Sequence, residues 1–457
     1  MPEIPLNTAV NKHLLDKLMR LAQVKRITAT QEIADVHGVL VAAAGTRISA
    51  GHVEAFSGRK LKKTIESSLR VEDAVDTGLI VQTAQRIIDT SMPVNRILAA
   101  TGDSAAAALA HLSQMTFGDP LRLLLTLADH DGAQALEHAV GVSLLSICMA
   151  RKLQLSNDDQ RAAGLAGLLH DIGELYTAPG WLVPGKRLLP HEWAHLVIHP
   201  RLGQMLVGEL ATYPAAVARA VAEHHERFDG SGYPRQTPGK RISPPGLAVS
   251  VAEMIAGVLG KDSPLERAEL ALKIIPGEHA RELVSAISRA RRLQGPAHPA
   301  THAEVAGRED PRRLSQRIGA VLELGQRLQD GPGAKSPHAS DLLGRTLERI
   351  LTIQRSFIST GLDAYLNVNH GLSDDGMLGF EKAVATREIQ WRLRDIARDL
   401  ALHTAASPDE KSLFASLIAL LDDDSDGDLA HAPKAAPAPR LEARMPTSVA
   451  RDQPCAS

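Results

Sequence analysis

Apolar residues recur every three to four positions along most of the chain, with polar residues between them, which is the spacing of amphipathic helices. The richness in Ala and Leu and the low content of aromatic residues, 3%, also favour helix over sheet. The pattern therefore predicts a mainly α-helical fold. The clearest helical runs cover residues 79–90, 94–100, 105–116, 132–155, 313–330, 340–366, 378–405 and 408–422.

The pattern differs near the N-terminus, where residues 26–75 contain short β-prone segments. Gly38 and Gly45 are expected at turns between these segments. Ser49 is a suitable N-cap for one short helix. We therefore predict a small β-containing module over residues 1–75.

The rest of the chain divides by composition, since a chain of 457 residues exceeds the usual size of one domain, roughly 100–200 residues. We predict a helical domain over residues 76–292, a linker over 293–312, a C-terminal helical region over 313–422 and a disordered tail over 423–457. Residues 313–422 contain no catalytic constellation. Their apolar stripes suit a helical bundle, a homodimer surface or the docking of a signalling protein, and the sequence does not choose among these.

Composition and charge exclude some classes of function. The formal net charge is -2, so no broad basic surface exists to hold a long nucleic acid. The two cysteines, Cys148 and Cys455, do not suggest a disulfide framework. No apolar run reaches the length of a membrane span, and the N-terminus lacks the apolar region of a signal peptide. The sequence thus predicts a cytoplasmic protein without a membrane span.

Candidate ligand residues gather at the ends of predicted helices. Ser156 is a suitable N-cap for a helix that we expect to stop at Gly173, interpreted as a C′ glycine. Pro190 and Pro214 open two further helices, the first expected to end before Pro200. Helix ends can converge on one cleft in a bundle. The candidates are His138 on the run of residues 132–155, then His170, Asp171, His199, His224 and His225 at the three helix ends.

Imidazole and carboxylate groups suit Fe, Mn, Zn, Ni or Cu better than Ca or Mg, which prefer oxygen ligands. Five His and one Asp exceed the needs of one tetrahedral ion, so we predict two divalent metal ions bridged by Asp171. Two metals about 3.5–4 Å apart can activate a water and bind both oxygens of a phosphoryl displacement. A single His on a helix is more often structural, but the grouping at helix ends argues against that alternative.

Two motifs, HDIG (170–173) and HHERFDGSGYP (224–234), resemble those of the HD-GYP family. These proteins are metal-dependent phosphodiesterases of the HD superfamily that hydrolyse the bacterial messenger cyclic di-GMP. The similarity covers about residues 125–260. It implies an HD-type helical bundle, two metal ions (Fe or Mn), and cyclic di-GMP or a related phosphoester as the substrate.

The resemblance also implies roles for single residues. Asp171 would bridge the metals and serve catalysis. Asp229, Gly232 and Tyr233 belong to the segment that borders the substrate cleft. Glu226, beside this segment, is left open between a motif role and an exposed helix-end carboxylate. The implied metal ligands are His138, His170, Asp171, His199, His224, His225 and Glu253, the last standing where the family has an aspartate.

Several positions depart from the family pattern. Glu174 occupies the catalytic position where the family has a lysine that contacts the scissile phosphate. One unit charge at 4 Å is worth roughly 4 kcal/mol at an effective dielectric of 20, so this reversal weakens the binding of an anion. Lys186, Arg187 or Arg227 are candidate replacements, with Lys186 our prediction for substrate binding.

Other departures concern the metals and the substrate grip. Gln134 stands where some members have a glutamate for a third metal, which favours a two-metal site. The motif after the aspartate ligand is altered around Ala256. The family's Arg-Pro-Tyr-Arg segment is replaced by GVLGKDSPLERA, which offers only Lys261 and Arg267.

Two hypotheses follow. The retained ligands favour a phosphodiesterase for cyclic di-GMP or another phosphoester. Glu174 and the lost arginines favour a catalytically inactive receptor or scaffold that signals through protein contacts.

Overall fold

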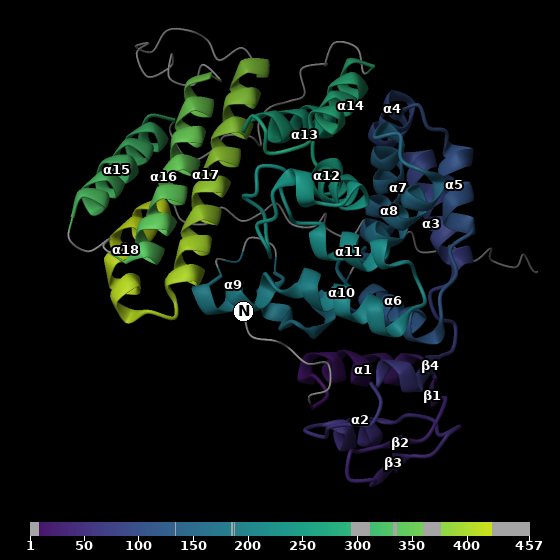
Figure 1. The fold of residues 1–457 in the computed structure, drawn as a ribbon. Helices are drawn as coiled ribbons and strands as arrows, with labels where there is room; N and C mark the ends of the chain where they lie inside the picture. Colours follow the sequence, from purple (N-terminus) through teal and green to yellow (C-terminus); the bar gives the residue numbers. More distant parts are fainter. Residues whose placement is uncertain are drawn as a thin grey trace, which may run out of the picture.

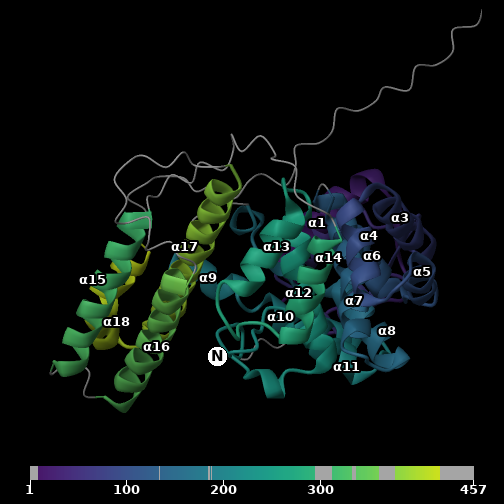
Figure 2. The same ribbon diagram turned by 90° about the horizontal axis from the view of Figure 1, so that it is seen from above.

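The computed structural model describes residues 9–132, 134–183, 186, 188–293, 311–331, 336–359 and 376–422. Helices dominate these residues (Figures 1 and 2), so the predicted helical fold class is confirmed. Within the described ranges, strands occur only between Ile27 and Val71. The tail predicted over residues 423–457 and most of the predicted linker lie outside the described residues.

The N-terminal module begins with a helix whose cap is set by sequence. The Asn11 side chain accepts hydrogen bonds from the backbone N–H groups of His13 and Leu14. Strands β1 and β4 pair antiparallel, with Ile27 opposite Val71, and β2 pairs with β3. The predicted β-containing module is therefore present. Its elements are α1 (Lys12–Val24), β1 (Ile27–Ala29), β2 (Ile33–Ala34), β3 (Leu40–Ala42), α2 (Ala50–Phe56), η1 (Glu66–Ser68) and β4 (Leu69–Val71).

The central helical region packs around α7, which contacts both α8 and α12. Every residue from Val140 to Ala150 is buried, because neighbouring helices surround α7. The elements are α3 (Thr77–Thr90), α4 (Met92–Thr101), α5 (Ala105–Ser113), α6 (Asp119–Asp131), α7 (Ala135–Lys152), α8 (Asn157–Leu169), η2 (Ile172–Tyr176), η3 (Pro179–Trp181), α9 (Pro190–Leu196), α10 (His199–Leu210), α11 (Ala215–Glu223), η4 (Gly239–Arg241), α12 (Pro244–Leu259), α13 (Pro264–Lys273) and α14 (Arg281–Arg292).

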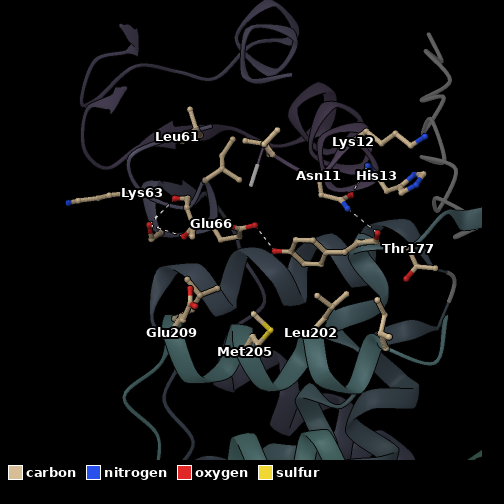
Figure 3. A pocket seen from close by; sticks show the side chains of 18 of the residues that line it. Asn11, Lys12, His13, Leu61, Lys63, Glu66, Thr177, Leu202, Met205 and Glu209 are labelled. Atoms are coloured by element: carbon tan, nitrogen blue, oxygen red, sulfur yellow. Dashed lines mark hydrogen bonds between the residues drawn. The ribbon is translucent and has the colours of Figure 1, made fainter. Parts of the chain in front are cut away.

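A groove of about 900 Å³ separates the N-terminal module from the central region, and hydrogen bonds cross it (Figure 3). The Tyr176 hydroxyl, at the end of η2, donates to Glu66 Oε1, and Asn11 Nδ2 donates to the Tyr176 carbonyl at 3.2 Å. Burial raises the pKa of Glu66, which favours the protonated carboxyl in this contact. The module is thereby fastened to the short helix that directly follows Asp171.

The C-terminal helices form a second hydrophobic core, to which the central region adds Ile274 and Ile275. They are α15 (Pro311–Asp330), α16 (Pro337–Ser359), α17 (Gly376–Thr404) and α18 (Pro408–Leu421). Helix α17 also packs against α9 and α13 of the central region (Figure 2). These helices form a bundle, one of the three arrangements considered. The domain boundaries, the homodimer and the signalling partner stay predictions.

Among the described residues, no single helix combines the length and the apolar composition needed to cross a membrane. Helices α6 and α7 satisfy those criteria only as a pair, which is bent by 120° at the break between them.

Candidate metal centre

Most of the predicted ligands come from the ends of central helices, and Glu253 lies within α12. His138 lies in the first turn of α7, and His170 is the C-cap of α8. Asp171 precedes η2, and His224 is the C-cap of α11. Ser156 accepts from the Asp159 N–H at the start of α8, as the sequence predicts.

Two predicted helix boundaries are wrong. His199 does not end the helix opened by Pro190 but begins α10, with Pro200 in its first turn. Proline is tolerated there because the first N–H groups of a helix have no partner within the helix. Gly173 is not a left-handed C′ glycine, since it lies within η2 and does not have a positive φ.

Gly173 is required for close packing instead. A Cβ at this position would lie 2.1 Å from the His199 carbonyl oxygen and 2.9 Å from the carbonyl carbon. Only glycine allows η2 to approach α10 so closely. This contact brings Asp171, which precedes η2, close to His199, which begins α10.

The seven predicted ligands lie together around Asp171. One group of ligand atoms, all within 4.8 Å of one another, contains Asp171, His199, His224 and His225, and a second contains His138, His170 and Asp171. The two oxygens of Asp171 face different groups. Oδ1 is 3.4 Å from His199 Nε2 and 3.6 Å from His224 Nε2, whereas Oδ2 is 3.0 Å from His170 Nε2.

Glu253 joins the second group, since its Oε2 atom lies 3.1 Å from His138 Nε2 and 3.2 Å from His170 Nε2. The shared carboxylate and its two sets of neighbours have the arrangement expected for a bridging ligand between two ions. The assignment of these seven side chains as ligands stays a prediction.

Backbone contacts orient three of the imidazole rings. The Nδ1 atoms of His170, His199 and His224 lie 2.7–2.8 Å from the carbonyl oxygens of Gly167, Leu196 and Val221. A carbonyl only accepts, so each Nδ1 carries the proton and donates it. In a neutral ring, Nε2 is then left as a lone-pair donor aimed into the centre, which is the form of histidine that binds metals.

The donor set fits a cation. The Nε2 atoms of His199 and His224 are 3.1 Å apart, and when both rings are neutral their two lone pairs cannot hydrogen-bond to each other. His170 Nε2 and Glu253 Oε2 are buried and make no hydrogen bond in the described structure. A metal ion would satisfy such buried groups, whereas a purely structural cluster would leave them costly.

The electrostatics of the centre are those of a cation site. Burial disfavours the charged form of every side chain in the centre. For the two carboxylates, the neighbouring imidazoles outweigh burial and lower the pKa. The His170 imidazole holds the pKa of Asp171 well below its usual range, and His138 and His170 do the same for Glu253. Burial, reinforced by His224, holds the pKa of His225 well below its usual value, so its ring stays neutral.

One side of the centre is open to solvent. The side chains of Asp171, His138 and Glu253 are 34%, 29% and 21% exposed, whereas those of His170 and His224 are almost fully buried. The partly exposed ligands thus all lie on the side of the centre formed by Asp171, His138 and Glu253.

The loop after α11 borders the centre. The Tyr233 ring lies 4.5 Å from that of His225, measured between centroids, and packs edge-on against Trp193 of α9. Gly232 is buried, and a Cβ there would lie 2.4 Å from the His225 carbonyl oxygen. Asp229 is exposed and accepts hydrogen bonds from Ser231, which shapes the turn rather than the centre.

The sequence left Glu226 open, and the structure excludes the exposed carboxylate. Glu226 is 1% exposed and accepts the backbone N–H groups of Arg235 and Thr237 at 2.8 and 2.9 Å. It therefore holds the two ends of the Gly232–Tyr233 segment together. Trp193 was missed, because nothing in the local sequence distinguishes it from an ordinary core aromatic.

Three of the candidate cations for the substrate are paired with carboxylates. Lys186 contacts Glu192 at 2.8 Å, and Arg227 contacts Glu278 at 3.0 Å. Arg267 contacts Asp262 at 2.6 Å, and Arg187 lies outside the described residues. The role of Lys186 in substrate binding stays a prediction.

Glu174 lies close enough to act on the centre. Burial lowers the pKa of His199, but the Asp171 hydrogen bond and the Glu174 charge outweigh it and raise the value. The negative charge that replaces the family lysine therefore reaches a candidate ligand.

Comparison with known proteins gives matches over the same region. The HD domain family model matches residues 122–280. A cyclic di-GMP phosphodiesterase of Pseudomonas aeruginosa is 38% identical over 106 residues, 23% of this chain and 26% of that protein. A 3'3'-cGAMP-specific phosphodiesterase of Vibrio cholerae is 31% identical over 136 residues, 29% of this chain and 30% of that protein.

A cyclic di-GMP phosphodiesterase of Thermotoga maritima is 27% identical over 173 residues, 36% of this chain and 47% of that protein. The chain thus spans less than half the length of each of these relatives. The matched residues contain all seven candidate ligands and both motifs. Residues 122–280 are therefore an HD domain, and within this region the chain is similar to cyclic dinucleotide phosphodiesterases.

Proposed function

We propose that this protein is a metal-dependent phosphodiesterase that hydrolyses cyclic di-GMP in bacterial second-messenger signalling. The observation that carries the proposal is the shared carboxylate: Asp171 presents one oxygen to His199 and His224 and the other to His170. The names of the relatives from Pseudomonas aeruginosa and Thermotoga maritima support cyclic di-GMP as the substrate.

The seven candidate ligands would hold two divalent ions, with Fe or Mn the proposed identities. When bound, such a pair lowers the pKa of water and stabilises negative charge on phosphoryl oxygens. The backbone carbonyls of Gly167, Leu196 and Val221 keep the imidazole rings in the tautomer that binds a cation. The two oxygens of Asp171 face the two groups of ligands, and because its side chain is 34% exposed, a phosphodiester would approach from this side.

The loop beside the centre would position the substrate. Tyr233 packs on His225, so the loop lies beside the group of ligands formed by Asp171, His199, His224 and His225. Glu226 keeps both ends of this loop in place through backbone N–H groups. A substrate bound along the loop would therefore place its phosphate near the exposed edge of Asp171. The proposed setting is the cytoplasm.

Two observations favour alternatives. The match to a 3'3'-cGAMP-specific phosphodiesterase makes a hybrid cyclic dinucleotide the second candidate substrate. The pairing of Lys186, Arg227 and Arg267 with carboxylates leaves fewer cations for phosphate, which favours a receptor that binds without turnover.

The test is turnover by anaerobically purified protein, loaded with Fe(II) or Mn(II), of cyclic di-GMP and 3'3'-cGAMP in parallel. We expect hydrolysis of cyclic di-GMP that is lost in Asp171→Asn, a variant of the same size. Hydrolysis of 3'3'-cGAMP alone would show that the proposed substrate is wrong and that 3'3'-cGAMP takes its place. Tight binding of either dinucleotide without hydrolysis would show that the protein is a receptor and not an enzyme.

A further inference from the structure

The start of the loop beside the metal centre is held by Glu278, in the turn between α13 and α14. Arg227 Nη1 contacts Glu278 Oε1 at 3.0 Å, and the Phe228 N–H donates to the Glu278 carbonyl at 2.9 Å. Arg227 also packs over the Trp391 ring at 5.0 Å. Both the side chain and the backbone at this end of the loop are therefore fixed by partners distant in sequence.

Helix α17 holds Glu278 in turn. Arg392 is 5% exposed, and its Nη2 and Nε atoms donate to Glu278 Oε2 at 2.6 and 3.0 Å. Its Nη2 also donates to the Ala271 carbonyl at 3.0 Å. Burial alone would raise the pKa of Glu278, but Arg392 and Arg227 lower it to about 2. A buried, charge-assisted contact of two N–H groups with one carboxylate oxygen holds the two elements at a defined distance.

The other end of the loop meets the same helix. Gln236 Nε2 donates to Asp399 Oδ1 at 2.8 Å, and Asp399 is held by Arg349 of α16 at 3.0 Å. Arg398 of α17 lies over the ring of Trp193, which packs against Tyr233. Helix α17 therefore contacts the end of the loop directly at Gln236. It reaches the start of the loop through Glu278 and the middle through Trp193.

We propose that Arg392 and Asp399 are positioning residues, through which the C-terminal helices set the conformation of the loop 227–238 and the affinity for substrate. The effect on affinity rests on the proposed function, whereas the effect on the loop does not. Among the described residues, no hydrogen bond or ion pair joins Arg392 or Asp399 to a candidate ligand. They act through Arg227 and Gln236 on the segment that places Tyr233 against His225.

The experiment uses the full chain with Arg392→Gln and, because a buried carboxylate then loses a partner, the milder Asp399→Asn and Gln236→Ala. Arg345→Gln is the matched control, since it breaks an exposed ion pair with Asp341 on α16. The readouts are hydrogen–deuterium exchange of residues 227–239, metal content, and kinetics with cyclic di-GMP and with bis(p-nitrophenyl) phosphate. The last is a small diester, chosen because we expect its hydrolysis to depend on the metal centre more than on the loop.

We expect roughly tenfold faster exchange in the loop and roughly tenfold higher KM for cyclic di-GMP, the equivalent of losing one charged hydrogen bond. Metal content and kcat with the small diester should stay within about twofold, and Arg345→Gln should resemble the wild type. Unchanged loop exchange in all three variants would overturn the proposal. Faster loop exchange with an unchanged KM would contradict the proposed effect on substrate affinity but not the effect on the loop. If the wild type hydrolyses neither ester, the proposed function fails and loop exchange alone decides the inference.

Discussion

Gly173→Ala tests whether the approach of η2 to α10 builds the metal centre. The added Cβ would lie 2.1 Å from the His199 carbonyl oxygen, whereas ordinary contact begins at 3.4 Å, so the two elements must separate by about 1.3 Å. Both neighbours are backbone atoms, so no side chain can rotate away. Overpacking of this kind costs roughly 1–3 kcal/mol of stability.

The separation also moves Asp171 away from His199. In the wild type, Asp171 Oδ1 lies 3.4 Å from His199 Nε2. A misplacement of about 1 Å can cost roughly 10²-fold in rate, so we expect turnover to fall by about that factor. The assay is turnover of cyclic di-GMP together with metal per chain. Gly208→Ala is the control, because a Cβ at that position of α10 meets nothing within 4 Å. Wild-type metal content and turnover within twofold in Gly173→Ala would refute the reasoning.

Two further outcomes follow from charges. Glu174→Gln should raise kcat/KM for cyclic di-GMP several-fold, because one negative charge near His199 is removed. Added salt should reduce this gain. An equal or lower kcat/KM at low salt would contradict this prediction. Glu278 has a folded pKa of about 2 against an ordinary 4.5, so below pH 4.5 the unfolded state binds more protons and stability falls as the pH falls towards 2. The loss should approach about 3 kcal/mol, and urea unfolding at pH 5 and pH 3 should show a smaller drop in Glu278→Gln than in the wild type; equal drops would show that another group controls the acid sensitivity.

Periodicity and motif spacing were sufficient for the helical fold class and for the set of residues that meet at the centre. His170 and His224 lie at helix ends as the sequence predicts, although the stop signal assigned to Gly173 was wrong. Proline before or within a first turn is ambiguous, and Pro200 was therefore read as a stop although it starts α10.

Contacts between distant segments were not predictable. The role of Gly173 depends on the position of α10, and nothing in the HDIG motif specifies that distance. Lys186 looked available for a phosphate because its partner Glu192 is recognisable only once α9 is placed. The link from Arg392 to Arg227 through Glu278 joins segments more than a hundred residues apart, and a single sequence carries no signal for it.

The central claim is that Asp171 is shared by two metal positions, and metal stoichiometry in three variants tests it most directly. Protein loaded anaerobically with Mn(II) or Fe(II) and then desalted should hold two ions per chain. His138→Ala and His225→Ala should each lose the ion on one side, whereas Asp171→Ala should lose both, because each oxygen faces a different group. Two ions retained in Asp171→Ala, or no metal bound by the wild type, would contradict the account.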